Sequence, residues 1–357
     1  MKKMNSTSVF FAAGRPFSPI YSLAMKIREK LYGTKIWSQA SVQVPVISVG
    51  NLTLGGSGKT PVVQYLARLL QASGYTPAVI SRGYGGKTFH PVNIVSDGET
   101  VFLDADEAGD EPRLLAETLA GVPVLTGRKR IVPARKAISM GADVLLLDDG
   151  FQHLQLKRDI DLVLFNADFL AGNSRVFPGG HLREPVSALH RATCFLLTGV
   201  TDANQDRAHK FAELLNSRFP GNNTCFAGYD IAGSFQVDNE GGICPDEKDS
   251  INQMTCYGFC GIARPDSFRD TLKGVYKKVV GFSAFSDHVQ YTEKEISRII
   301  ARAGQAEADC LVTTEKDLVK LRHFSFSLPL HVIQMRVSAD NAFDQLILNA
   351  LSALDFS

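Results

Sequence analysis

A glycine-rich run at residues 50–61 has the residue types and spacing of a phosphate-binding loop. It follows an apolar segment rich in Val and Ile at 44–49 and precedes a segment of helical periodicity that ends at Gly74. Glycines let backbone N–H groups close around phosphate oxygens, and the N-terminus of the following helix adds a favourable dipole. Lys59 is spaced to reach the β- and γ-phosphates of a nucleotide, and the Thr60 hydroxyl to bind Mg²⁺. The predicted nucleotide-binding residues are Thr53, Leu54, Gly55, Gly56, Ser57, Gly58, Lys59 and Thr60.

This loop departs from the commonest phosphate-loop pattern at two positions. Thr53 stands where the first glycine is usual, and Leu54 stands where one subclass of double-glycine loops carries a lysine. The alternative interpretation is a glycine turn that precedes Lys-Thr by chance. The flanking strand and helix favour a P-loop, because that combination is the context the motif requires.

Two acids predict the other half of the site. Asp148 and Asp149 follow the apolar run at residues 143–147. A carboxylate at the end of a strand beside a P-loop faces the phosphates and holds Mg²⁺, directly or through water. An aspartate at a strand end can also cap a turn. The glycine loop upstream favours the metal-binding interpretation of the pair. Which of the two binds Mg²⁺ directly is left open.

The segments that must position these residues alternate between strand-like and helix-like patterns. This alternation predicts an α/β fold of the P-loop NTPase type, with a mostly parallel sheet and helices on both faces. The expected strands cover residues 44–49, 77–81, 122–125, 143–147, 161–165 and 195–198, and helices are expected after the loop and at 128–140 and 205–219.

The second half of the chain predicts a smaller α/β lobe. Residues 225–237 alternate weakly and lead into a turn-like stretch at 239–242, which predicts an antiparallel β-ribbon that joins the two lobes. Further strands are expected at 254–259, 278–282, 310–314 and 328–335, with a helix at 292–303. The expected parts are therefore a basic segment at 1–37, the P-loop domain at 38–222, the ribbon linker at 223–250 and the smaller lobe at 251–357.

Length and composition fit a globular protein of about two domains. The 357 residues are 45% hydrophobic and 21% charged, which argues against disorder and collagen-like structure. A net charge of +1 argues against a general nucleic-acid binder. The six cysteines lack zinc-type pairing, so reduced thiols are expected. No run of 18 apolar residues exists and the run Val9 to Ala13 is too short for a secretory signal, so we expect no transmembrane helix and a mature chain that begins near Met1.

The N-terminal segment carries a concentrated positive charge. Residues 1–37 hold seven basic residues and one acid, a balance of +6 that leaves −5 for the remainder. Ser18-Pro19 predicts a helix with Ser18 as its N-cap, ending at Gly33. A basic amphipathic helix fits a membrane interface; a terminal helix packed on its own domain is the equally open alternative. The apolar stripe comprises Ile20, Leu23, Ala24, Ile27 and Leu31, and Lys26, Arg28, Glu29 and Lys30 lie off it.

Seven ordered motifs resemble those of the tetraacyldisaccharide 4'-kinases of lipid A biosynthesis. The resemblance runs from about residue 16 to about residue 336, and the order of the motifs makes it specific. The motifs are SVGNLT at 48–53 with its glycine loop, SRGYG at 81–85, GDEP at 109–112, DDGFQH at 148–153, LREP at 182–185, FSDH at 285–288 and TTEKD at 313–317.

This resemblance implies a kinase that uses ATP and Mg²⁺ to phosphorylate the 4'-hydroxyl of a tetraacyldisaccharide 1-phosphate. It also implies a place at the cytoplasmic face of the Gram-negative inner membrane, with the N-terminal helix on the membrane surface. The expected partners are the lipid A disaccharide 1-phosphate and that surface, with no nucleic acid and no obligate protein partner.

The family's motifs also imply roles for individual residues. Asp110 would be the catalytic base and His288 its partner from the second lobe, while Lys59 and Asp149 complete the catalytic set. Asp148, Asp149 and Thr60 would hold Mg²⁺. Active-site or substrate loops would contribute Arg82, His153, Arg183 and Glu184.

The residues alone leave alternatives for the proposed base and its partner. Asp110 also suits a helix N-cap, because Glu111-Pro112 opens a helix, and His288 suits a structural histidine. As a base, a positioned carboxylate can accept the proton of a sugar hydroxyl, and a hydrogen-bonded histidine can orient it or tune its pKa. If the two residues lie on different lobes, closure would assemble the site and exclude water.

Three other functions share some of these features. A regulatory P-loop ATPase would hydrolyse ATP without a lipid acceptor and has no need of the Asp110 and His288 motifs. An ATP-dependent ligase would activate a carboxylate. A non-catalytic membrane scaffold would not need both Lys59 and the acidic pair.

Overall fold

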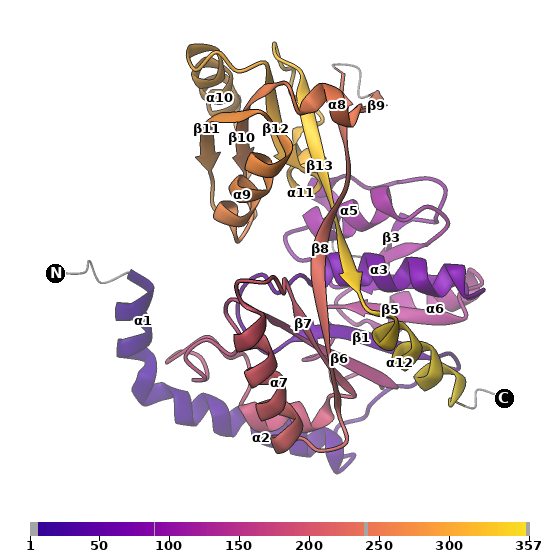
Figure 1. The fold of residues 1–357 in the computed structure, drawn as a ribbon. Helices are drawn as coiled ribbons and strands as arrows, with labels where there is room; N and C mark the ends of the chain where they lie inside the picture. Colours follow the sequence, from indigo (N-terminus) through magenta and orange to yellow (C-terminus); the bar gives the residue numbers. More distant parts are fainter. Residues whose placement is uncertain (1–5, 89, 239–241, 355–357) are drawn as a thin grey trace.

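A computed structural model of the chain describes residues 6–88, 90–238 and 242–354. Figure 1 shows two lobes joined by two long strands, with the N-terminal helices running out from the larger lobe. One 13-stranded sheet passes through both lobes, in the order β11-β10-β12-β13-β8-β7-β6-β1-β5-β2-β4-β3, with β9 paired to β8.

The larger lobe is a mostly parallel sheet centred on β1, which lies between β5 and β6 and is parallel to both. Because the carboxyl ends of these three strands meet at one edge, the glycine loop and the acidic pair are brought to the same place. The fold class predicted from the sequence is confirmed. The elements are β1 (Val46–Asn51), α3 (Lys59–Ala72), β2 (Pro77–Ser81), β3 (Asn93–Ser96), α4 (Ala105–Ala108), α5 (Asp110–Thr118), β4 (Val124–Thr126), α6 (Ile131–Ser139), β5 (Val144–Asp148), β6 (Ile160–Asn166), η2 (Val186–Arg191), β7 (Cys194–Thr198) and α7 (Gln205–Arg218).

Helices cover both faces of this sheet because both faces of its strands are apolar. In β1, Ile47 and Val49 join the cluster under α3 and α5, whereas Val46 joins the cluster under α6 on the opposite face. The aromatic rings of Phe165 and Phe195 fill a third cluster, which lies beneath α7. The P-loop strand is therefore held from both sides.

The smaller lobe is a second α/β unit. Its parallel strand β10 lies between β11 and β12, and helices pack on it, as the pattern of the second half predicts. The elements are β9 (Ile243–Pro245), α8 (Lys248–Ile251), β10 (Thr255–Cys260), α9 (Pro265–Val275), β11 (Lys278–Ala284), α10 (Glu293–Gln305), β12 (Cys310–Thr314) and α11 (Glu315–Leu321).

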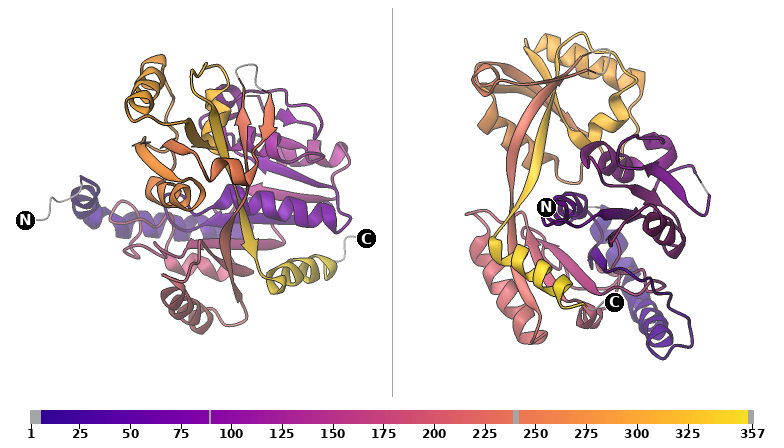
Figure 2. Two further views of the ribbon diagram at one scale, coloured as in Figure 1. Left: turned by 45° about the horizontal axis from the view of Figure 1, so that its top comes forward. Right: turned by 90° about the vertical axis from the view of Figure 1, so that its right-hand side faces the viewer.

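The antiparallel ribbon expected within residues 223–250 is formed only in part by that segment. β8 (Asn223–Val237) pairs antiparallel with β13 (Leu330–Ala339) along the whole of β13, whereas β9 pairs only with the end of β8. The two long strands run from one lobe to the other in Figure 1 and in both views of Figure 2. The two strands lie far apart in the sequence, so local turn signals did not reveal the pairing.

The C-terminal helix also lies outside the expected lobe. α12 (Asn341–Ser352) follows β13 and places Phe343, Ile347 and Leu351 in the hydrophobic cluster beneath the P-loop helix α3. The segment 251–357 expected as the smaller lobe therefore ends with a helix packed on the larger lobe. The reason is that β13 carries the chain back across the ribbon.

The N-terminal segment forms α1 (Ser6–Gly14), the short η1 (Arg15–Phe17) and α2 (Ser18–Gly33). Ser18 is the first residue of α2 rather than its N-cap, which is Phe17. Its hydroxyl instead donates to the Val176 carbonyl and accepts from the Gly179 N–H, both at 2.8 Å, which docks the start of the helix on the larger lobe. Within the described ranges, no helix has the length and apolarity needed to cross a membrane.

Candidate active site

The glycine loop lies between β1 and α3, as its sequence predicts. Gly58 adopts a φ of 78°, and a Cβ at this position would lie 1.9 Å from the hydroxyl oxygen of Tyr229. Only glycine combines that backbone conformation with such a close approach. The Thr198 hydroxyl donates to the Ser57 carbonyl at 2.9 Å, so the neighbouring strand β7 also fixes the loop.

The two unusual loop positions have structural explanations. Thr53 is buried and forms an antiparallel bridge with Leu182, so it does not need the backbone freedom of glycine. Leu54 donates its N–H to the His181 carbonyl and leaves its side chain exposed. The entry to the loop is therefore tied to the segment that carries Arg183 and Glu184.

Lys59 sits at the start of α3, and its ammonium group faces two side-chain oxygens. Its Nζ lies 3.3 Å from Asn51 Oδ1 and 3.4 Å from Asp149 Oδ1. Arg183 donates two hydrogen bonds to Asp149, at 2.9 and 2.8 Å. Although burial acts in the opposite direction, these two cations lower the pKa of Asp149 to about 2. Asp149 is thus ionised beside the lysine that is expected to contact phosphate.

Asp148 differs from Asp149 in its surroundings. It ends β5, is 1% exposed, and its Oδ2 accepts from the Ser81 hydroxyl at 3.3 Å, while its Oδ1 is buried without a hydrogen-bond partner. Burial raises the pKa of Asp148 to about 7, and the charges of Glu111 and Asp149 add to this. An oxygen donor set from Asp148, Asp149 and Thr60 suits Mg²⁺, and the unpartnered oxygen of Asp148 fits a ligand that coordinates there.

Asp110 and His288 are brought together from different lobes. Asp110 opens α5 and is 5% exposed, and its Oδ2 lies 3.2 Å from His288 Nδ1. The N-cap of α5 is Gly109 and Asp110 makes no capping bond, so the capping interpretation does not describe this structure. Lys320, from α11, lies 3.4 Å from the same oxygen of Asp110.

Opposite pKa shifts accompany this contact. Burial alone would raise the pKa of Asp110, but the hydrogen bond to His288 and the charges of Lys320 and Lys316 outweigh it and lower that pKa. The same hydrogen bond raises the pKa of His288, against burial and the charge of Lys316. The pair therefore favours an ionised carboxylate beside a protonated imidazole.

The remaining predicted residues differ in how they relate to the acidic pair. Glu184 is buried and pairs with Arg191 and Arg28 rather than with the loop. Burial, together with the charges of Arg130 and Arg158, lowers the pKa of His153 to about 3, so its imidazole is neutral. Arg82 is exposed at the end of β2, which neighbours β5. Arg82 and His153 thus lie near the ends of β2 and β5, whereas Glu184 belongs to an ion-pair cluster next to Arg183.

Three polar residues near the site were missed in the sequence. Asn51 holds Lys59, and Arg130 is 2% exposed and acts electrostatically on Asp148 and Asp149 with two guanidinium nitrogens unpartnered. Lys320 is buried between Asp110 and Asp317. Asn51 and Lys320 lie in or beside the quoted motifs, but their side-chain directions follow only from tertiary packing. Arg130 gave no signal beyond a basic run before a helix.

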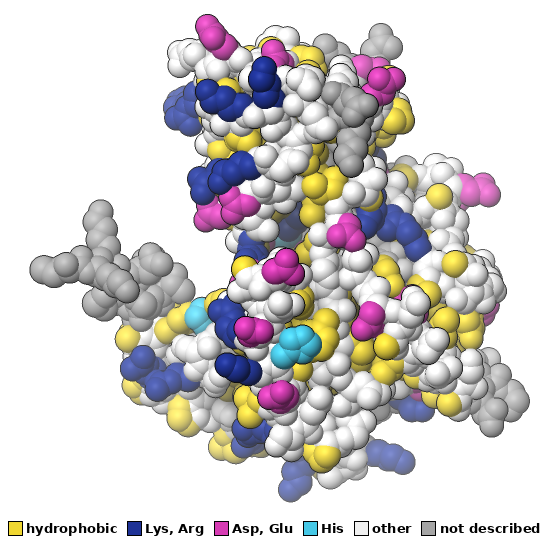
Figure 3. Space-filling model, in the orientation of Figure 1, with side chains coloured by type: hydrophobic (Ala, Val, Ile, Leu, Met, Phe, Trp, Pro, Cys, Tyr) yellow, Lys and Arg dark blue, Asp and Glu magenta, His cyan; other side chains and the backbone are white. Residues whose placement is uncertain are grey.

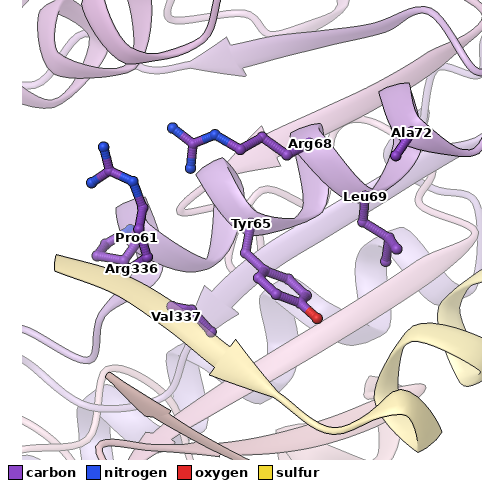
Figure 4. Close-up of a pocket in the computed structure, with 7 residues that line it drawn as sticks. All are labelled: Pro61, Tyr65, Arg68, Leu69, Ala72, Arg336 and Val337. Atoms are coloured by element: carbon purple, nitrogen blue, oxygen red, sulfur yellow. The ribbon is translucent and has the colours of Figure 1, made fainter. Parts of the chain in front are cut away.

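A surface pocket of about 430 Å³ lies along α3 next to β13. Figure 4 shows the guanidinium groups of Arg68 and Arg336 above its apolar side chains. None of the predicted site residues lines it. The chemistry argued here therefore belongs to the loop end of α3 and not to this pocket, which is lined by Pro61, Tyr65, Arg68, Leu69, Ala72, Arg336 and Val337.

The chain is similar over most of its length to kinases of one family. The model of the tetraacyldisaccharide-1-P 4'-kinase family matches residues 11–352. A tetraacyldisaccharide 4'-kinase from Desulfotalea psychrophila is 43% identical over 98% of this chain and 99% of its own length. One from Syntrophus aciditrophicus is 40% identical over 94% of this chain and 91% of its own.

A solved structure has a similar fold. The crystal structure of LpxK from Aquifex aeolicus in complex with ATP is 30% identical in sequence, with a TM-score of 0.74. The similarity covers 94% of this chain and 98% of that one. It therefore includes both lobes and the ribbon.

Proposed function

This chain belongs to the tetraacyldisaccharide-1-P 4'-kinase family, and we propose that Asp110, His288, Lys59 and Asp149 form its catalytic centre. The reaction transfers the γ-phosphate of ATP to the 4'-hydroxyl of a tetraacyldisaccharide 1-phosphate in lipid A biosynthesis. Family membership favours this activity over a regulatory P-loop ATPase. The observation that carries the residue assignment is the 3.2 Å contact between Asp110 and His288 across the two lobes.

In this proposal the hydroxyl oxygen attacks the γ-phosphorus while the bond to the β–γ bridging oxygen breaks and ADP leaves. Asp110 accepts the hydroxyl proton, and His288 orients the carboxylate through their hydrogen bond. Lys59 and the backbone N–H groups of the glycine loop stabilise the charge on the phosphoryl oxygens. The two lobes exclude water, which otherwise competes with the sugar as the acceptor.

Mg²⁺ would be held by the oxygens of Thr60, Asp148 and Asp149. When bound, it neutralises charge that develops between the β- and γ-phosphates. Arg183 would keep Asp149 in place through its two hydrogen bonds. Asp148 must lose its proton before it can bind a cation, because its pKa is raised by burial.

The deciding experiment is transfer of labelled γ-phosphate to a tetraacyldisaccharide 1-phosphate dispersed in detergent. We expect labelled lipid 4'-phosphate to form only with acceptor, ATP and Mg²⁺ all present. A regulatory ATPase would release labelled inorganic phosphate at the same rate with or without the lipid. That second result would overturn the kinase assignment.

The outward face of α2 supports contact with a membrane surface. Ile20, Leu23 and Ile27 are 68%, 58% and 50% exposed, so the apolar stripe faces solvent and not the protein. Lys26 and Lys30 are exposed on the same helix. At the lower left of Figure 3, hydrophobic and basic side chains lie next to each other over these helices. Such a face suits the interface of an anionic bilayer, and we place the enzyme at the cytoplasmic face of the Gram-negative inner membrane.

Vesicle co-sedimentation tests this placement. Replacing Ile20, Leu23 and Ile27 together by Ser should release the protein from vesicles that contain anionic lipid. Leu214, which is 59% exposed on α7, provides a matched control, because Leu214→Ser removes the same kind of side chain elsewhere. Equal binding of the triple variant and the wild type would show that α2 does not contact the bilayer.

A further inference from the structure

Helix α2 has a second, polar face that points into the larger lobe. Tyr21, Arg28 and Glu29 make their contacts there, while the apolar stripe lies on the outside. A membrane anchor alone needs only the outer face. The inner face instead contacts the two loops that bring Gln152 and Arg183 to the candidate active site.

Arg28 connects α2 to the lysine of the glycine loop. Its guanidinium donates to the Gln152 carbonyl at 2.8 Å. The amide of Gln152 donates to the Asn51 carbonyl at 3.0 Å, and the Asn51 side chain accepts from Lys59 Nζ at 3.3 Å. Three hydrogen bonds therefore lead from α2 to Lys59.

Tyr21 leads to the same place by another route. Its hydroxyl donates to the Arg183 carbonyl at 3.1 Å, and the Arg183 side chain holds Asp149, which lies 3.4 Å from Lys59 Nζ. Both routes end at the contact between Asp149 and Lys59. The position of α2 is thus coupled to the pair expected to contact Mg²⁺ and phosphate.

A buried charge cluster makes this coupling stiff. Glu184 is 2% exposed and pairs with Arg191 and with Arg28, at 3.6 Å for the latter, while Arg191 also pairs with Glu29. The Arg191 guanidinium lies 4.5 Å from the centre of the Phe151 ring, next to Gln152. Because breaking a buried ion pair destabilises the fold strongly, a shift of α2 would disturb the contacts of Glu184 and Arg191 and, through them, the neighbouring residues.

From these contacts we infer that α2 is a positioning element of the phosphotransfer site, and that Arg28 and Tyr21 are positioning residues for Lys59 and Asp149. The inference rests on the kinase assignment above but not on attachment of α2 to a membrane. Phosphoryl transfer depends on geometry at the level of about 1 Å.

Arg28→Met tests the inference, because Met keeps the length of the stem and removes every donor. Activity is measured in detergent micelles, where affinity for a bilayer does not limit turnover. We expect kcat to fall at least tenfold, with the KM for the lipid within about twofold of the wild type. Arg28→Lys, which retains one donor, should restore part of the loss. Arg135→Met, at an exposed arginine on α6, controls for the same chemical change.

Tyr21→Phe removes a single hydroxyl and provides a second test if Arg28→Met does not fold. We expect kcat to fall severalfold with an unchanged melting temperature and unchanged vesicle binding. A kcat within twofold of the wild type for both folded Arg28→Met and Tyr21→Phe would overturn the inference. If the wild type itself transfers no phosphate to the lipid, the kinase assignment fails instead, and the two failures remain distinct.

Discussion

Asp110 Oδ2 and His288 Nδ1 lie 3.2 Å apart although the residues belong to different lobes and are 178 positions apart in the chain. Two further ionic links join α5 to the smaller lobe. Lys320 lies 3.4 Å from Asp110 Oδ2, and Arg322 pairs with Glu117 at 2.6 Å. The contact between Asp110 and His288, our proposed catalytic pair, is therefore formed by the packing of α5 against the smaller lobe.

Asp110→Asn and His288→Ala should each lower kcat much more than the affinity for ATP. Asparagine keeps the size of the side chain but cannot accept the hydroxyl proton, and alanine removes the partner without touching the glycine loop. General-base contributions are typically about 10²- to 10⁴-fold. Single-turnover kinetics measures the loss of kcat, and a separate binding experiment measures the affinity for ATP.

The double variant shows whether the two residues act as a unit. If they do, Asp110→Asn with His288→Ala should be little worse than the more damaged single variant. Losses that multiply would give the residues separate tasks, with His288 acting on the substrate. A fully active Asp110→Asn enzyme would remove Asp110 from the mechanism, and Asp149 would become the candidate base.

Lys59→Ala should lower kcat by about 10²- to 10³-fold, the range found when one preorganised charge or donor is removed from a transition state. Lys87→Ala is a matched control, because Lys87 is a largely exposed lysine whose partner, Asp106, is also largely exposed. The measurement is γ-phosphate transfer by proteins with equal melting temperatures. Near-normal transfer by folded Lys59→Ala would contradict the P-loop assignment.

The requirement for Mg²⁺ should depend on pH through Asp148. Burial raises the pKa of this carboxyl to about 7, so it is mostly protonated at pH 6 and mostly ionised at pH 8. Since the cation binds the ionised form, the Mg²⁺ concentration that gives half-maximal kcat should fall about tenfold over that interval. Kinetic titration with Mg²⁺ at each pH checks this, and Asp148→Asn should remove the pH dependence along with most of the activity.

The raised pKa of Asp148 also determines how the stability of the fold changes with pH. A carboxyl whose folded-state pKa lies above its unfolded value stabilises the fold fully at low pH, and this contribution is lost as the pH rises through about 7. The contribution of Asp148 should therefore lower the melting temperature of the metal-free protein at pH 8 relative to pH 6. Thermal melts of the wild type and of Asp148→Asn at both pH values, without Mg²⁺, check this. The difference in melting temperature between pH 6 and pH 8 should be smaller in Asp148→Asn. An equal difference in both proteins would show that Asp148 is not its cause.

Local patterns predicted the parts of this fold that local residues determine. The strand before Gly50, the glycine loop and the helix at Lys59 follow from hydrophobic runs and glycines close together in the chain. The pairing of β8 with β13 was missed because it joins strands distant in sequence. The stripe of α2 was predicted, but periodicity alone does not say which face packs inward, and here Arg28 and Glu29 face the protein.

The site shows the same limit. Sequence motifs named Asp110 and His288, but their contact depends on how α5 meets the smaller lobe. Lys320 stands just after the TTEKD motif and was overlooked, because a lysine on a helix is ordinarily exposed. Its burial beside Asp110 follows from a three-dimensional arrangement that no short motif encodes.

Lys320→Met should shift the pH dependence of kcat. Lys320 lies 3.4 Å from both Asp110 Oδ2 and Asp317 Oδ1, and its charge is one of the causes that keep the pKa of Asp110 below its ordinary value. Without that cation the pKa of Asp110 rises, so less of the base is ionised at low pH. The loss of kcat should therefore be larger at pH 5.5 than at pH 8.

Arg322→Met is the matched control for this prediction. Arg322 stands just after the end of α11 and pairs across the lobes with Glu117, which lies near the opposite end of α5 from Asp110. Its loss should weaken the lobe contact without moving the acidic limb of the profile. Profiles of kcat between pH 5.5 and 8.5 for both variants decide the matter. If the two variants lose activity in parallel at every pH, Lys320 contributes only to packing between the lobes and does not tune the base.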